Sequence, residues 1–156
     1  MPYDPGRHGD GPWHVVSAVF EEYGFPFAAD DYDADVAHPD EHYDGVRGWF
    51  RVAETLVGEV VGCVGLTDEG GGEFELHRLY VLRAHRGTGL GAALTRWVVD
   101  EARARGARRL VLFSDIHFED AHRLYRHLGF RCYRFRYAPD PWASREWGFE
   151  MVMRRA

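Results

Sequence analysis

Residues 75–130 read ELHRLYVLRAHRGTGLGAALTRWVVDEARARGARRLVLFSDIHFEDAHRLYRHLGF. A strand with partial alternation, expected over residues 73–82, leads into a glycine-rich loop. An amphipathic helix follows, and its apolar residues share one face: Leu90, Leu94, Trp97, Val98 and Ala102. Gly106 stops this helix, the apolar run 109–114 fits a buried strand, and a second helix is expected over 117–128. The stretch therefore predicts a β-α-β crossover followed by a helix.

The loop 86–91 reads RGTGLG and joins the strand to the start of the first helix. Glycines let backbone N–H groups approach an anion closely, and a helix start adds unpaired donors and the positive end of a dipole. A pyrophosphate would fit there, with Arg86 suited either to holding the loop or to pairing with a phosphate. A glycine-rich turn without a ligand is the alternative.

The flanking segments complete a mixed sheet. A helix is expected from Pro12 to Gly24, followed by an acidic short helix or loop. Two hairpins are also expected, from strands over 48–54 and 57–66 and over 130–137 and 147–154. The order predicts an α/β (α+β) fold in one domain, residues 1–156, with antiparallel strands first and a βαβ crossover in the middle.

Composition excludes several classes of protein. The formal net charge is −6, which argues against a nucleic-acid partner. No apolar run approaches the roughly 20 residues that span a membrane, and the N-terminus has no signal-peptide pattern, so we expect a cytoplasmic protein. All 19 basic residues are arginine and lie mostly after residue 77, whereas the first 75 residues are acidic. This asymmetry suggests contact with an anion on one half and a cation on the other, unless both are solvated surface.

Two other motifs match the patterns of different classes of protein. Gly87, Gly89 and Ala92 satisfy a dinucleotide-binding pattern, but too few residues follow for the remaining parallel strands of that fold. Residues 38–42 read HPDEH and match an inverted zinc-protease pattern, but no third ligand follows. We therefore expect no metal.

Residues 75–130 resemble the GNAT superfamily of acyl-CoA N-acyltransferases, and the likeness extends over about 46–137. One signature of that family is read here from Arg86 to Gly91, and a second from Ala121 to Phe130. The resemblance implies splayed central strands, acetyl-CoA as co-substrate, and main-chain contacts from Leu79, Tyr80 and Val81 to its pantetheine arm. It also implies that the pyrophosphate is held by the amides of Arg86, Gly87, Thr88, Gly89, Leu90 and Gly91. Phe118 stands where many members carry an asparagine, which puts one cofactor hydrogen bond in doubt.

The resemblance also assigns catalytic roles. Tyr125 matches the tyrosine that protonates the departing thiolate, although its spacing also fits a packed helix face. Glu75 matches the base of one protein-acetylating branch of the family, with an exposed strand carboxylate as the alternative. His77 alternates onto the same face of the strand and is the second candidate for the base.

The sequence does not name the acceptor. Direct attack by a primary amine of a small molecule or peptide is expected. The family's acceptor segments here hold seven carboxylates and two tryptophans, which suit a cationic amine: Asp30, Asp31, Asp33, Asp35, Asp40, Glu41, Asp44, Trp142 and Trp147. A solvated acidic surface, with a last hairpin that covers the core or a homodimer seam, is the alternative. A coenzyme-A-binding sensor or interaction module without turnover is the second hypothesis for function.

Overall fold

The computed structural model describes residues 1–28 and 31–154 and contains one mixed six-stranded sheet. Its strands are β1 Gly48–Glu54, β2 Val60–Gly70, β3 Glu73–Val81, β4 Arg109–Asp115, β5 Arg131–Tyr137 and β6 Arg145–Val152. The helices are α1 Pro5–His8, α2 Gly11–Tyr23, α3 Ala34–Ala37, α4 Pro39–His42, α5 Leu90–Ala104 and α6 Glu119–His127, with a 3-10 turn η1 at Arg83–His85.

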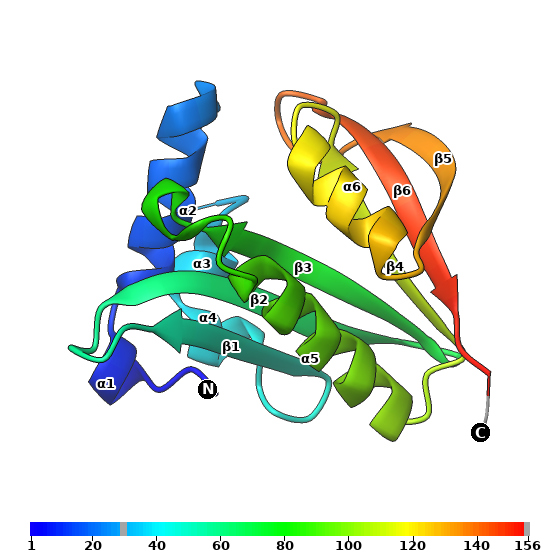
Figure 1. The fold of residues 1–156 in the computed structure, drawn as a ribbon, viewed down its shortest axis with the longest axis horizontal. Helices are drawn as coiled ribbons and strands as arrows, with labels where there is room; N and C mark the ends of the chain where they lie inside the picture. The colour runs from blue at the N-terminus through cyan, green and yellow to red at the C-terminus, as the bar shows by residue number, and fades with distance from the viewer. Residues whose placement is uncertain (29–30, 155–156) are drawn as a thin grey trace.

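The sheet order is β1-β2-β3-β4-β6-β5, and β3 and β4 are its parallel pair. Their register runs from Glu73↔Arg109 to Leu76↔Leu112 and stops there, although both strands continue. Figure 1 shows the two strands close together near the C-terminus and diverging toward α2. The expected mixed sheet with a central crossover and splayed strands is confirmed.

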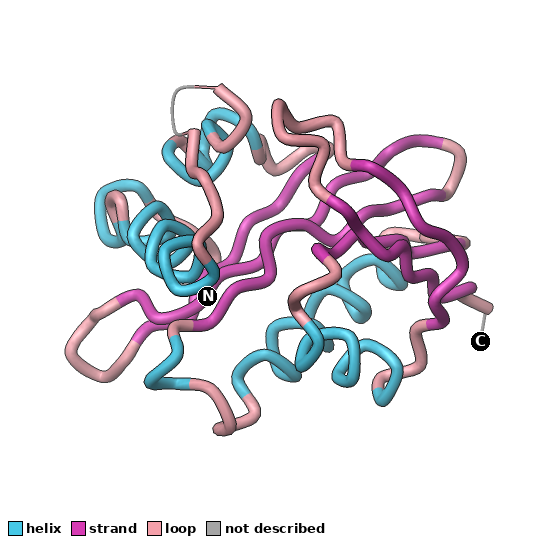
Figure 2. The backbone as a smooth tube through the Cα atoms, turned by 90° about the horizontal axis from the view of Figure 1, so that it is seen from above, coloured by secondary structure: helices cyan, strands magenta, loops and turns pink. Residues whose placement is uncertain are grey.

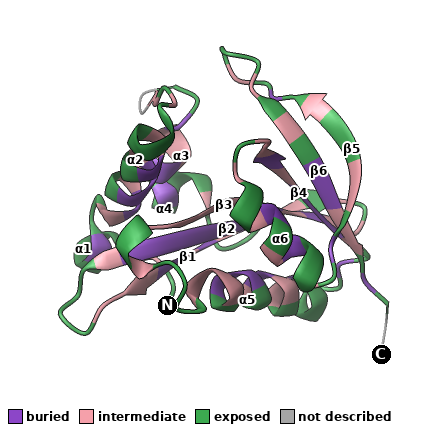
Figure 3. Cartoon of the chain, turned by 45° about the horizontal axis from the view of Figure 1, so that its top comes forward, coloured by how far each residue is buried: buried purple, intermediate pink, exposed green. Residues whose placement is uncertain are grey.

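Helices cover both sides of the sheet (Figure 2). Val98 of α5 and Tyr125 of α6 pack with Leu112 and Phe149 in the larger core, while Val16 of α2 belongs to a second core against β1 and β2. Figure 3 shows the contrast along the sheet, with β2 largely buried and β5 at the exposed edge. The apolar run in β4 is buried from Leu110 to Leu112, as its composition predicts.

The N-terminal segment and the acidic segment that follows α2 form more regular secondary structure than the sequence predicts. Asp4 caps α1 by accepting from the amide of Gly6, and Pro2 forms an antiparallel bridge with Arg51. The acidic segment forms the single turns α3 and α4. The apolar face of α2 is buried at Val15, Val16 and Val19, whereas Tyr23 at its end is 36% exposed.

Candidate active site

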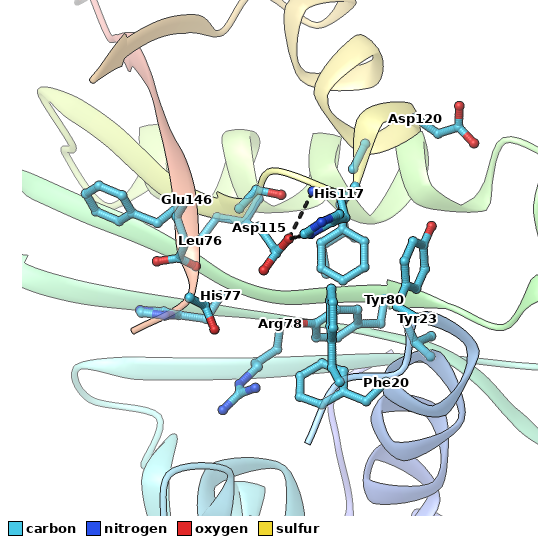
Figure 4. Close-up of a pocket in the computed structure, with 18 of the residues that line it drawn as sticks. Phe20, Tyr23, Leu76, His77, Arg78, Tyr80, Asp115, His117, Asp120 and Glu146 are labelled. Atoms are coloured by element: carbon cyan, nitrogen blue, oxygen red, sulfur yellow. Dashed lines mark hydrogen bonds and ion pairs between the residues drawn. The ribbon is translucent and has the colours of Figure 1, made fainter. Parts of the chain in front are cut away.

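A cleft of about 1040 Å³ opens where β3 and β4 diverge. Its walls come from α2, β3, the start of α5, the end of β4, α6 and the loop before β6. Figure 4 shows Phe20, Tyr23 and Tyr80 gathered on one side, with Asp115 and His117 across from them. The cleft therefore brings together segments that are far apart in the sequence.

The glycine-rich loop lies at the start of α5 with free main-chain donors. Gly87 and Gly89 have φ angles of 78° and 85°, a conformation that residues with a Cβ rarely adopt. The first helical bond runs from the amide of Ala93 to the carbonyl of Gly89 at 3.0 Å. Within the described residues, the amides of 87–92 have no protein acceptor. This geometry is that of an anion-binding helix start.

Arg86 holds the loop in place. Its guanidinium donates to both carboxylate oxygens of Glu22 at 2.7 and 2.8 Å, and its Nε donates to the carbonyl of Val81 at 3.0 Å. The hydrogen bond from Arg86 lowers the pKa of Glu22. Thr88 adds a bond from its hydroxyl to the carbonyl of His85 at 2.8 Å. Of the two roles that the sequence left open for the Arg86 side chain, the structure shows the first.

The pairing of β3 with β4 ends at Leu76, so the part of β3 that carries Leu79, Tyr80 and Val81 pairs with none of the described strands on that side. On its other side this segment pairs with β2, for example Tyr80 with Cys63. An extended group that enters the cleft can therefore use this edge as a strand would.

A bulge lies just before this edge. Arg78 has a φ of 55°, and the register of β2 and β3 shifts at this point. Its guanidinium lies 2.8 Å from carboxylate oxygens of both Asp33 and Asp35. Tyr43 also donates to Asp35 at 3.0 Å, and burial raises the pKa of Tyr43. These contacts hold the strained residue, and they tie the acidic segment to the strand.

Tyr125 lies on α6 and lines the cleft with only 3% of its surface exposed. Its ring packs against Phe130 and Phe149, with ring centroids 5.8 and 5.5 Å away. Burial raises the pKa of Tyr125 above its ordinary value. Its hydroxyl makes no hydrogen bond to the described parts of the chain, so it is a protonated donor that faces the cleft.

Glu75 and His77 point to the same side of β3, as the alternation predicts. The Nε2 atom of His77 lies 3.0 Å from a carboxylate oxygen of Glu75 and 2.8 Å from the hydroxyl of Thr67. Burial opposes the charge on His77, but hydrogen bonds to Glu69 and Glu75 outweigh it and raise the pKa to about 9. The hydrogen bond from His77 lowers the pKa of Glu69 to about 2. At neutral pH His77 is therefore an imidazolium and cannot be a base.

Only some of the residues predicted to contact the acceptor line the cleft. Asp33 and Trp142 line the cleft, whereas Trp147 packs on Phe135 of β5, with ring centroids 5.6 Å apart. Asp30 lies outside the described residues. The other carboxylates of the segment do not line the cleft: Asp31, Asp35, Asp40, Glu41 and Asp44.

Phe118 fills the position where the sequence lacks the expected asparagine. Its ring lies 4.7 Å from Tyr23, 5.6 Å from Phe25 and 6.0 Å from Tyr80, measured between centroids. The side chain therefore joins the two walls of the cleft by apolar contact, and it cannot donate a hydrogen bond.

Sequence reasoning missed Asp115, His117 and Glu146 as cleft residues. Burial raises the pKa of Glu146, although Arg136 opposes this. An Asp-x-His pattern directly after a buried strand was the available signal for the first two, because a strand end opens into the cleft.

The described residues contain one group of three side chains that could ligate a metal, Glu69, Glu75 and His77. His38 and His42 of the inverted zinc-protease pattern are not part of it. Among the described helices, none is long and apolar enough to cross a membrane.

Comparison with known proteins identifies the class. The chain is 30% identical over 118 residues to an uncharacterized N-acetyltransferase of Schizosaccharomyces pombe, which covers 75% of this chain and 72% of the relative. It is 33% identical over 132 residues to aminoalkylphosphonate N-acetyltransferase of Salmonella typhimurium, with 79% and 78% covered. An aminoglycoside 6'-N-acetyltransferase crystallised with coenzyme A has the same fold, with a TM-score of 0.73 at 16% identity over 100% and 98% of the two chains. The protein is an acyltransferase.

The sequence profile described as the Acetyltransferase (GNAT) family matches residues 14–130. The chain belongs to this family, which confirms the resemblance drawn from its two signatures.

Proposed function

We propose that the protein transfers an acetyl group from acetyl-CoA to a primary amine of a small molecule or peptide by direct attack. The observation that carries the proposal is the row of unpaired amides over residues 87–92, at the mouth of a cleft that also holds Tyr125. Two comparisons support it. One structural neighbour was crystallised with coenzyme A, and one relative is named for an amine acceptor.

The chain's own groups fit such a donor. The amides from Gly87 to Gly91 would hold the diphosphate, with Gly87 and Gly89 supplying the close approach. The amide of Arg86, which was predicted to join them, already donates to the carbonyl of Arg83 at 3.3 Å, and Arg86 instead anchors the loop through Glu22. The open edge of β3 over residues 79–81 would pair with the amide groups of the pantetheine arm. Coenzyme A supplies the activated thioester, and the residues bind it and orient it.

Tyr125 is the proposed acid. Its hydroxyl keeps its proton because burial raises its pKa, and no acceptor in the described residues competes for that proton. It can therefore protonate a thiolate as the carbon–sulfur bond breaks. A main-chain N–H near Leu79 would stabilise the oxyanion.

Glu75 is the carboxylate that we propose meets the acceptor. The carboxylate lies half buried in the cleft and remains a candidate for the base. His77 serves as its partner rather than as a base, because the imidazolium lies 3.0 Å away and compensates its charge.

The second candidate is a coenzyme-A-binding module without turnover. The Tyr125 hydroxyl disfavours it, since this donor makes no hydrogen bond to the described residues and faces the cleft, where a reacting group can reach it.

The test has two steps. Isothermal titration with coenzyme A measures binding, and a library of primary amines is then screened for free thiol released from acetyl-CoA. We expect binding and amine-dependent thiol release. Tight binding without release by any amine would favour the module, and no binding heat with folded protein would end the proposal.

A further inference from the structure

The loop between β4 and α6 presents a histidine and a carboxylate to the cleft. Nδ1 of His117 lies 2.5 Å from Oδ1 of Asp115, and the main-chain N–H of His117 donates to the same oxygen at 2.9 Å. The Asp115 side chain is 14% exposed, whereas that of His117 is 53% exposed. Figure 4 shows the pair joined on the cleft wall near Glu146. Asp115 thus fixes the ring, and the ring stays accessible.

This contact determines the tautomer. A carboxylate oxygen only accepts, so the proton of the neutral imidazole must be on Nδ1. Nε2 then carries a lone pair, which is the form that removes a proton from another group. Asp115 also stabilises the imidazolium that results.

The pair lies close to the edge of β3 proposed for the pantetheine arm. His117 contacts Phe25 with ring centroids 5.8 Å apart, and the ring of the next residue, Phe118, lies 6.0 Å from that of Tyr80. The loop therefore spans the cleft beside the path by which the thioester would enter.

We infer that His117 accepts a proton from the acceptor ammonium group, with Asp115 as its positioning residue. The inference rests on the proposed function and assigns its base. Glu75 then takes no proton, because its own carboxylate is already paired with His77.

The proton balance is simple. The acceptor nitrogen loses two protons as its bond to the acyl carbon forms and the carbon–sulfur bond breaks. One goes to Nε2 of His117 and then to water, since the ring is exposed. The other replaces the proton that Tyr125 gives to sulfur. One proton is released per turnover, and no electron is transferred.

Other groups that titrate or carry charge surround this part of the cleft. They lie on α2, α6 and β6 in addition to β4, and the pH profile must be read with them in view: Tyr23, Asp120, Arg145 and Glu146. Glu146 is paired with Arg136 at 2.9 Å.

The test compares kcat/KM against pH for wild type, His117→Gln and Asp115→Asn. His14→Gln is the matched control, because His14 of α2 pairs with Asp10 at 3.1 Å and does not line the cleft. At pH 7, with an alkylamine acceptor, we expect about a 100-fold loss for His117→Gln and about a tenfold loss for Asp115→Asn. His117→Gln should also change the dependence of kcat/KM on pH.

The decisive measurement repeats the kcat/KM comparison with an acceptor that is already uncharged at pH 7, such as a weakly basic fluorinated alkylamine. The loss for His117→Gln should shrink below about tenfold with it, since no proton has to be removed before attack. An unchanged pH profile, or an equal loss with both amines, would overturn the inference even if activity falls. Asp115→Asn repeats the test with the ring in place, should His117→Gln fold poorly. Failure of the proposed function gives a different result, in which the wild type releases no thiol with any amine.

Discussion

Alanine at Gly89 separates anion binding from helix stability. Gly89 precedes α5 with a φ of 85°, and Gly106 follows the same helix with a φ of 83°. A Cβ built at either position meets nothing within 4 Å. Both substitutions therefore cost backbone strain of about 1 kcal/mol and no clash. In a chain of this length that lowers Tm by roughly 2–4 °C in each variant.

Only Gly89→Ala should weaken the binding of coenzyme A. The methyl group takes space beside the unpaired amides, and its backbone preference turns those amides away. Loss of one charge-assisted hydrogen bond, about 1.5–3 kcal/mol, corresponds to a rise in Kd of roughly 10- to 150-fold. Isothermal titration measures it, with Gly106→Ala expected to bind like wild type. Equal Kd values for the two variants, at equal loss of Tm, would refute the assignment of the anion site.

Three further predictions concern single side chains. Tyr125→Phe should lower kcat by about tenfold or more with little change in Tm, because the hydroxyl makes no hydrogen bond within the described chain; unchanged turnover removes the acid role. Arg86→Ala and Glu22→Gln should both raise the KM for acetyl-CoA, because they break the same contact; a change in Arg86→Ala alone would mean that the arginine binds phosphate directly. The stabilisation from His77 should be complete below pH 6.5 and lost as pH rises through about 9, while that from Glu69 should be complete above pH 4.5 and lost as pH falls toward about 2. The difference in Tm between wild type and His77→Gln should therefore be largest between pH 4.5 and 6.5, where both contributions are complete. A difference in Tm that is constant from pH 5 to 10 contradicts the assignment.

Local patterns were sufficient for most of the fold. The strand over 48–54 has the bounds expected, because its alternation of buried and half-buried residues is complete within the segment. β2 was expected over 57–66 and lies at Val60–Gly70. Its last residues are polar, and they are in the strand because Asp68 pairs with Phe74 and Gly70 with Glu73 across the turn. Pairing with a neighbouring strand overrides local propensity there.

Local patterns predicted part of the candidate site, and contacts between distant residues determine the rest. The glycine spacing and the helix start predicted where an anion would bind, and alternation along β3 placed Glu75 beside His77. Neither pattern could show that Arg86 pairs with Glu22 rather than with a ligand, because the partner lies 64 residues away. The charge on His77 was equally hidden, since it depends on Glu69 across the hairpin.

The same long-range pairing accounts for part of the charge asymmetry in the sequence. Acidic side chains of the first half meet arginines of the second half inside the molecule, as Arg78 does with Asp33 and Asp35. Of these two carboxylates only Asp33 lines the cleft, and its pairing with Arg78 leaves it poorly placed to select a cationic acceptor. The other carboxylates that line the cleft lie on the sheet, at Glu75, Asp115 and Glu146, on α6 at Asp120 and before β6 at Asp140. Because a strand fixes a side chain more rigidly than a single helical turn does, we expect the sheet, rather than the acidic segment, to determine which amine reaches the thioester.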